Sequence, residues 1–145
     1  MRTRTLKTVT YWLSTGLVGL DFLVGGAFQI ARSPQAVQGF AHLGYPAYFM
    51  SLLGVWKVLG ALVLLLPGLP RLKEWAYAGI IFDVTAAVVS VVAVGDGWGS
   101  ASLPVAFLVL TLASWTLRPV SRTFATLSDS SARPAAVVTK AEAAA

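Results

Sequence analysis

Residues 48–94 read YFMSLLGVWKVLGALVLLLPGLPRLKEWAYAGIIFDVTAAVVSVVAV and give the clearest indication of the fold class. It contains two apolar runs, at about 48–66 and 75–94, and each is long enough to cross a bilayer as a helix. The segment PGLPRLKE between them has the prolines and the glycine of a turn, followed by cationic residues. The stretch therefore predicts two antiparallel transmembrane helices joined by a short turn.

Two further apolar runs flank this hairpin. The first, at about 9–31, follows a basic N-terminus at 1–8. Its length and the presence of Asp21 argue against a cleaved signal peptide. The last run, at about 103–117, gives a helix only about 22 Å long. Either it extends back toward Ser100 or the bundle thins there. With these two runs the chain is predicted to be an all-α, integral membrane four-helix bundle.

The remaining segments are short or polar. Ser33 and Pro34 are typical of a helix start, with serine as the N-cap and proline in the first turn. Apolar residues on one face after them predict a short interfacial helix at about 34–43. Residues 118–145 have no apolar periodicity and are predicted to form a disordered cytoplasmic tail.

Composition supports lipid as the solvent and excludes several classes of function. Hydrophobic residues make up 57% of the chain and charged residues 12%, which leaves more apolar surface than a soluble core of this length could hide. The net charge of +5 is not gathered in a stripe with aromatic residues, so nucleic-acid binding is not predicted. Cysteine is absent and His42 is the only histidine, so we expect neither a metal site nor a covalently bound cofactor.

The distribution of lysine and arginine predicts the orientation. Loops on the cytoplasmic side carry an excess of these residues. One side of the predicted bundle has only Arg32, whereas the other has nine: Arg2, Arg4, Lys7, Arg71, Lys73, Arg118, Arg122, Arg133 and Lys140. Both termini are therefore predicted to be cytoplasmic, in the cytoplasmic membrane of a bacterium.

Three ionisable residues lie deep inside the apolar runs. At about 1.5 Å per residue, Lys57 and Asp83 lie about 12–13 Å from the cytoplasmic helix ends and Asp21 about 18 Å. Each would cost about 2.5–3.5 kcal/mol if it faced lipid, so we expect all three to form one buried network, with Lys57 closest to Asp83. Two carboxylates against one ammonium leave an excess, and Asp21 is the expected proton carrier.

The faces around these charges are rich in small residues, which favour close helix packing or a narrow cavity. Such faces include Gly54 and Gly60 beside Lys57, and Gly79 beside Asp83. The charges then form either a ligand pocket or a buried pair that only fixes helix register. Further polar residues that could contact the network are Gln29, His42 and Ser90.

The motifs HLGYP at 42–46, GVWKVLG at 54–60 and KEWAYAG at 73–79 make the chain similar to the DoxX-like family of small bacterial membrane proteins. The resemblance covers all four helices. It implies a link to membrane oxidoreductase systems, with a quinone as a candidate ligand. Many members have Ser-His near the outer end of the third helix, whereas here Ser90 is followed by Val91.

No self-sufficient catalytic constellation is present. The function we expect is therefore a small subunit that binds an apolar or quinone-like molecule and supports a redox system, with a partner oxidoreductase subunit or a second copy as the protein partner. The alternatives are a non-catalytic membrane scaffold, a proton-coupled carrier of a small solute, and a small isomerase or cyclase that uses an aspartic acid. The aromatic residues, including Trp56 and Trp75, are expected to form belts at the two membrane interfaces.

Overall fold

The computed structural model describes residues 2–118, with side chains from Thr5 onward, and it is helical throughout these residues apart from the turns. The five helices are α1 (Arg2–Ile30), α2 (Pro34–His42), α3 (Ala47–Leu65), α4 (Pro70–Ala93) and α5 (Gly97–Thr116). All except α2 are long and apolar enough to cross a membrane. The predicted four-helix architecture is therefore confirmed, while most of the predicted tail lies outside the described residues.

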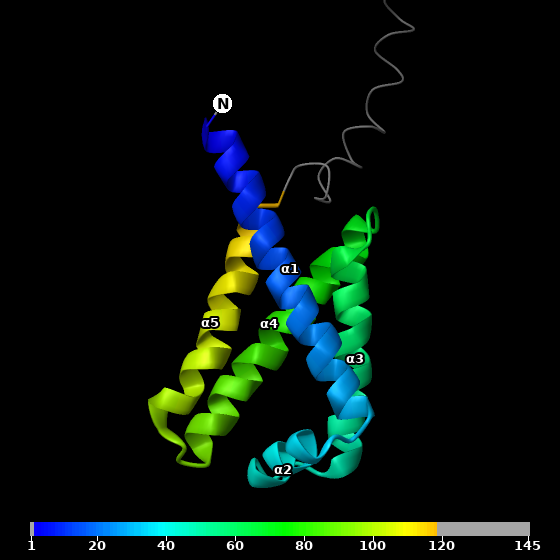
Figure 1. Ribbon diagram of the computed structural model, residues 1–145, viewed down its shortest axis with the longest axis vertical. Coiled ribbons are helices and arrows are strands. Elements are labelled where there is room, and N and C mark those ends of the chain that lie inside the picture. Colours follow the sequence, from blue (N-terminus) through cyan, green and yellow to red (C-terminus); the bar gives the residue numbers. More distant parts are fainter. Residues whose placement is uncertain (1, 119–145) are drawn as a thin grey trace, which may run out of the picture.

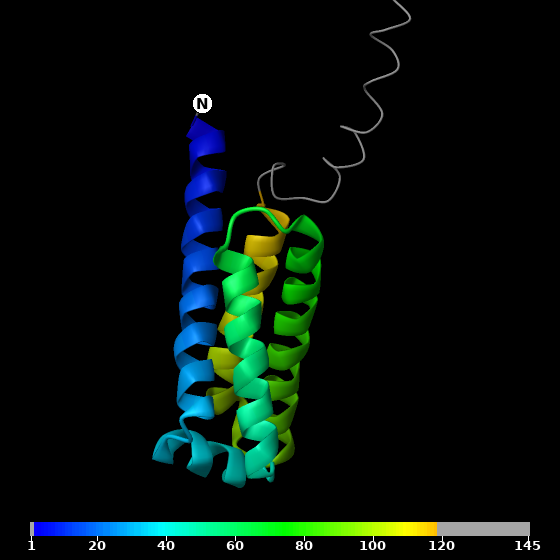
Figure 2. The same ribbon diagram turned by 90° about the vertical axis from the view of Figure 1, so that its right-hand side faces the viewer.

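The four long helices form a ring in which α1 packs against α3 and α5, and α4 packs against the same two helices. Figure 2 shows α3 in front, with α1 and α4 on its two sides. The start of α1, the turn between α3 and α4, and the end of α5 lie at one end of the bundle (Figure 1). Helix α2 lies across the opposite end, as a short amphipathic segment capped by Ser33, whose Oγ accepts from the Ala36 amide at 3.3 Å.

Two helices are longer than their apolar runs. Helix α1 begins at Arg2 rather than near residue 9, because arginine and lysine are good helix formers and a helix need not end where the bilayer does. Helix α5 begins at Gly97 rather than near residue 103, which gives it a length of about 30 Å, enough to span the bilayer. Ser102 lies inside this helix and its hydroxyl donates to the Gly99 carbonyl, and Pro104 lies inside the helix as well.

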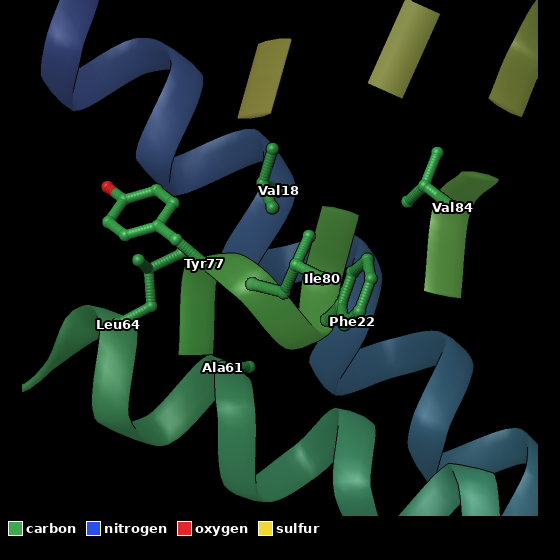
Figure 3. Close-up of a cluster of buried hydrophobic side chains, with 7 residues drawn as sticks. All are labelled: Val18, Phe22, Ala61, Leu64, Tyr77, Ile80 and Val84. Carbon is green, nitrogen blue, oxygen red and sulfur yellow. The ribbon is translucent and has the colours of Figure 1, made fainter. Parts of the chain in front are cut away.

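The core lies where α1, α3 and α4 meet. Figure 3 shows its seven buried side chains: Val18, Phe22, Ala61, Leu64, Tyr77, Ile80 and Val84. Many other large apolar side chains are exposed on the outer faces of the long helices, as expected where lipid replaces water around a protein. The core is small, so a few specific contacts determine how each helix pair is held.

Helices α1 and α3 make a close backbone contact. A Cβ atom built on Gly26 would lie 2.8 Å from the Gly54 carbonyl oxygen, and one built on Gly54 would lie 2.8 Å from the Gly26 carbonyl oxygen. Only glycine at both positions allows the two backbones to approach this closely. Helix α3 is thereby fixed against α1 along one face, and its other face is turned toward α4.

Candidate functional site

An ion pair joins α3 and α4 within their membrane-spanning parts. Lys57 Nζ lies 3.3 Å from Asp83 Oδ2, and the two side chains are only 18% and 13% exposed. The ammonium also lies 5.1 Å from the centre of the Phe22 ring on α1, within the range of a cation–π contact. The predicted pairing of Lys57 with Asp83 is confirmed.

The ion pair forms part of the wall of a groove of about 700 Å³ between α3 and α4. The rest of the lining is apolar or glycine. It comprises Phe22 from α1, Leu53, Trp56, Leu59, Gly60 and Val63 from α3, and Leu72, Trp75, Ala76, Gly79, Ile80, Phe82 and Ala86 from α4. This volume is typical of small-molecule binding sites. The combination of an apolar lining with a few convergent polar groups is typical of them too.

Small residues act differently on the two faces of α3. Gly54 allows the close approach to α1, as the sequence indicated. Gly60 and Gly79 line the groove instead, and a Cβ built on either of them would have no atom within 4 Å. We expected the small residues to allow either close helix packing or a cavity. Gly54 allows close packing, whereas Gly60 and Gly79 line a cavity.

Asp21 does not join the ion pair, so the structure brings together two of the three predicted charges. Among the described residues no cation lies within 4.0 Å of its carboxylate, although the charges of Lys57 and Asp83 act on it. Asp21 is exposed on α1, because the next residue, Phe22, takes the position that faces Lys57. Successive residues of a helix point about 100° apart, so both cannot face the same neighbour. Its role as a proton carrier stays a prediction.

None of the three expected secondary residues lines the groove. His42 Nε2 lies 2.9 Å from both carboxylate oxygens of Asp96, which ties α2 to the turn before α5. Ser90 Oγ lies 2.7 Å from the hydroxyl of Tyr45. Gln29 is buried, and its Oε1 has no hydrogen-bond partner among the described residues. The first two contacts hold the α2 segment under the bundle rather than extending the ion pair.

Two tryptophans that we assigned to interfacial belts, Trp56 and Trp75, also line the groove. Trp75, Gly79 and Asp83 are four residues apart along α4, and residues at that spacing lie on one helix face. Trp56 directly precedes Lys57 on α3. The spacing on α4 was therefore a usable indication that Trp75 and Asp83 line the same surface.

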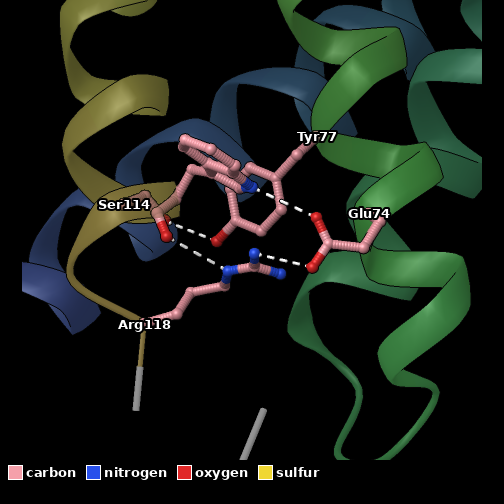
Figure 4. A network of polar contacts seen from close by, with 5 residues as sticks. Glu74, Tyr77, Ser114 and Arg118 are labelled. Carbon is pink, nitrogen blue, oxygen red and sulfur yellow. Dashed lines mark hydrogen bonds and ion pairs between the residues drawn. The ribbon is translucent and has the colours of Figure 1, made fainter. Parts of the chain in front are cut away.

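A second polar cluster lies near the start of α4 and the end of α5, and Figure 4 shows Glu74, Tyr77, Ser114 and Arg118 of this cluster. Ser114 Oγ lies 2.7 Å from the Tyr77 hydroxyl and 2.6 Å from Thr15 Oγ1, all three buried. Beside them Arg118 Nη2 lies 2.7 Å from Glu74 Oε1. Sequence reasoning missed this cluster, since single hydroxyls in apolar helices have no distinctive spacing. It ties α1, α4 and α5 together.

Lys73 is fully buried at the same end, although we counted it only as a topology residue. Its ammonium donates to the carbonyl oxygens of Val63 at 2.6 Å and Leu64 at 3.0 Å, and also to that of Leu66. The first two carbonyls belong to the last turn of α3 and the third to its C-cap residue, where a cation also interacts favourably with the helix dipole. Lys73 therefore joins the start of α4 to the end of α3.

The arrangement offers a donor and an acceptor inside an apolar groove, and within residues 2–118 no three side chains gather that could hold a metal ion. Among curated proteins and among solved structures no match to this chain is found. Residues 13–114, which include the groove and parts of all four long helices, match the DoxX-like family. The chain therefore belongs to the DoxX-like family of membrane proteins.

Proposed function

We propose that this protein is a small membrane subunit whose α3–α4 groove binds an apolar, quinone-like molecule and so supports a redox system whose prosthetic groups lie in another protein. The observation that carries the proposal is the apolar groove of about 700 Å³ with the Lys57–Asp83 ion pair in its wall. Such a groove matches a molecule that is mostly apolar and has a few oxygen atoms.

The chemistry of the ion pair fits such a ligand. The Lys57 ammonium has three donors, of which one is directed at Asp83, so a second can be given to a carbonyl oxygen. Asp83 can accept from a hydroxyl. Both groups lie within membrane-spanning helices, where polar side chains that are reached by a ligand are commonly functional. Trp75 and Phe82 at the groove are strongly exposed, which leaves its side open toward lipid.

Binding is tested with the purified full chain in phospholipid nanodiscs, with decylubiquinone as the probe and tryptophan fluorescence as the readout, since Trp56 and Trp75 line the groove. We expect saturable quenching in the natural protein and its loss in the double variant Lys57→Met with Asp83→Asn. The double variant removes both charges together and therefore avoids an uncompensated charge. Unchanged saturable quenching in the double variant would contradict the proposal.

The scaffold function is supported by a different aspect of the same pair. Lys57 and Asp83 already satisfy each other, and Phe22 lies beside the ammonium, which is also what a pair that fixes helix register requires. The two functions differ in the behaviour of the double variant in cells. A scaffold loses abundance or its partner, whereas a binding site keeps abundance and loses the probe.

We also propose that both termini face the cytoplasm of a bacterium. In support, Lys7, Arg71 and Arg118 belong to the end of the bundle that holds the start of α1 and the end of α5, while Arg32 lies beside α2 at the other end (Figure 1). Single cysteines at Gln38 and Ser100 are expected to react with a membrane-impermeant thiol reagent from outside sealed cells. Reaction of a Leu72→Cys variant with the reagent from outside would contradict the proposed orientation.

A further inference from the structure

We infer that Gly60 and Gly79 form a slot that selects an uncharged ligand with a flat ring, seated one helical turn from the Lys57–Asp83 pair. This inference rests on the proposed function and specifies the class of ligand. It depends on three features of the groove: the position of the two glycines, the space around them and the balance of charge.

The two glycines lie opposite each other across the groove. Helices α3 and α4 run antiparallel, so the residue three after Lys57 on α3 lies opposite the residue four before Asp83 on α4. The slot is therefore about 4.5–6 Å along the helices from the ion pair. An oxygen on a six-membered ring that rests on the glycines can reach the ammonium from that distance.

The space at the glycines is not used by the chain. A Cβ built on Gly60 or on Gly79 would have no atom within 4 Å, whereas Gly26 and Gly54 are needed for a backbone contact. Glycine is less favourable than alanine inside a helix, so it is expected where a side chain would occupy space that something else needs. At Gly60 and Gly79 no other part of the chain occupies that space, and because both residues line the groove, a ring bound there can use it.

The charge balance of the groove lining disfavours an ionised head group. Lys57 and Asp83 compensate each other, and every other side chain that lines the groove is uncharged. A ligand with its own charge would bring an uncompensated charge into an apolar site, which is costly. Trp56 and Trp75 in the lining add aromatic faces against which a flat ring can pack.

The test uses leucine variants that fill the slot, in the nanodisc assay with decylubiquinone. Gly60→Leu and Gly79→Leu should each raise the Kd of decylubiquinone about tenfold or more, because they occupy the volume that the ring needs. Gly16→Leu is the matched control, because Gly16 also has nothing within 4 Å of an added Cβ and does not line the groove. It should leave the Kd unchanged. Unfolding midpoints of all three variants should stay close to that of the natural protein.

Two competitors test separately whether the ligand needs a ring and whether it must be uncharged. Decanol has the alkyl chain without the ring, and decanoate adds a charge. Both should displace decylubiquinone poorly from the natural protein. Gly60→Leu should not weaken decanol further, because a chain without a ring does not need the slot. Displacement by decanoate at concentrations close to the Kd of decylubiquinone would contradict the inference that the ligand is uncharged.

The remaining outcomes distinguish the inference from the proposed function. Absence of saturable quenching in the natural protein contradicts the proposed function itself. Saturable quenching that the leucine variants leave unchanged keeps the proposed function and overturns the slot. If the leucine variants instead convert a dimer to a monomer in native mass spectrometry, the groove holds a second copy of the chain, and the inference is wrong.

Discussion

Gly26 and Gly54 lie where α1 crosses α3, and Gly60 and Gly79 lie on either side of the groove between α3 and α4. An added Cβ at Gly26 or Gly54 would come within 2.8 Å of a backbone oxygen, while at Gly60 and Gly79 it would meet nothing within 4 Å. The same residue type therefore serves close contact on one side of α3 and open space on the other. What decides between them is whether a neighbouring backbone occupies the space that the missing side chain leaves.

This difference implies that the two helix pairs are held by different forces. The α1–α3 pair gains from close packing along its glycines. The α3–α4 pair lacks such packing around the groove and has polar contacts instead, namely the Lys57–Asp83 ion pair and the Lys73 ammonium on the last turn of α3. Variants of the two kinds of contact can test this comparison.

The largest loss of the free energy of unfolding is expected from Lys57→Met, at the groove between α3 and α4. It leaves the Asp83 carboxylate without its cation in an apolar site, and breaking a buried pair in this way costs about 3–5 kcal/mol of the free energy of unfolding. Adding Asp83→Asn should recover most of the loss. The measurement is a double-mutant cycle in mixed micelles titrated with dodecyl sulfate. Simple addition of the two single losses would mean that the ion pair does not hold α3 to α4.

A smaller loss of the free energy of unfolding is expected from Lys73→Met. Lys73 joins the same two helices at the end where the chain connects them. The variant leaves the carbonyl oxygens of Val63 and Leu64 without a charged donor, for an expected loss of about 1.5–3 kcal/mol. Lys7→Met, at an exposed cation on α1, is the control and should change the same quantity by less than about 0.5 kcal/mol. Equal effects of the two variants would contradict a capping role for Lys73.

At the α1–α3 contact, Gly54→Ala should lower the free energy of unfolding by about 1–3 kcal/mol. The added Cβ would lie 2.8 Å from the Gly26 carbonyl oxygen and 2.9 Å from Gln29 Cβ. The first of these atoms is backbone and cannot turn aside, so α1 and α3 must separate. The same micelle titration measures the loss. A neutral Gly54→Ala would show that the α1–α3 contact is looser than the structure indicates.

The smallest effect, and the one of opposite sign, is expected from Gly60→Ala. Nothing lies within 4 Å of the added methyl group, and alanine is favoured over glycine in a helix by up to about 1 kcal/mol. The free energy of unfolding should therefore rise slightly in the absence of ligand. Gly54→Ala and Gly60→Ala form a matched pair on one helix, and a destabilisation of similar size in both would remove the distinction between the two faces of α3.

Four features could be predicted without the structure: the membrane class, the four spanning helices, the cap of α2 at Ser33 and the pairing of Lys57 with Asp83. These follow from properties that are local or nearly so. An apolar run long enough to span the bilayer has few alternatives to a helix. A turn of a few residues makes α3 and α4 antiparallel, which brings charges at similar depth on the two helices close together.

Four other features are visible only in the folded chain: the groove, the exclusion of Asp21 from the pair, the position of Trp75 in the groove, and the cluster of Thr15, Tyr77 and Ser114. Each depends on which face of one helix meets which face of another. Spacing along the chain defines a face but not its neighbour, because packing in the whole ring sets the rotation and separation of every helix. For that reason Gly54 and Gly60, each three residues from Lys57, cannot be told apart in the sequence. In the fold Gly54 allows a backbone contact with α1, whereas Gly60 lines the groove.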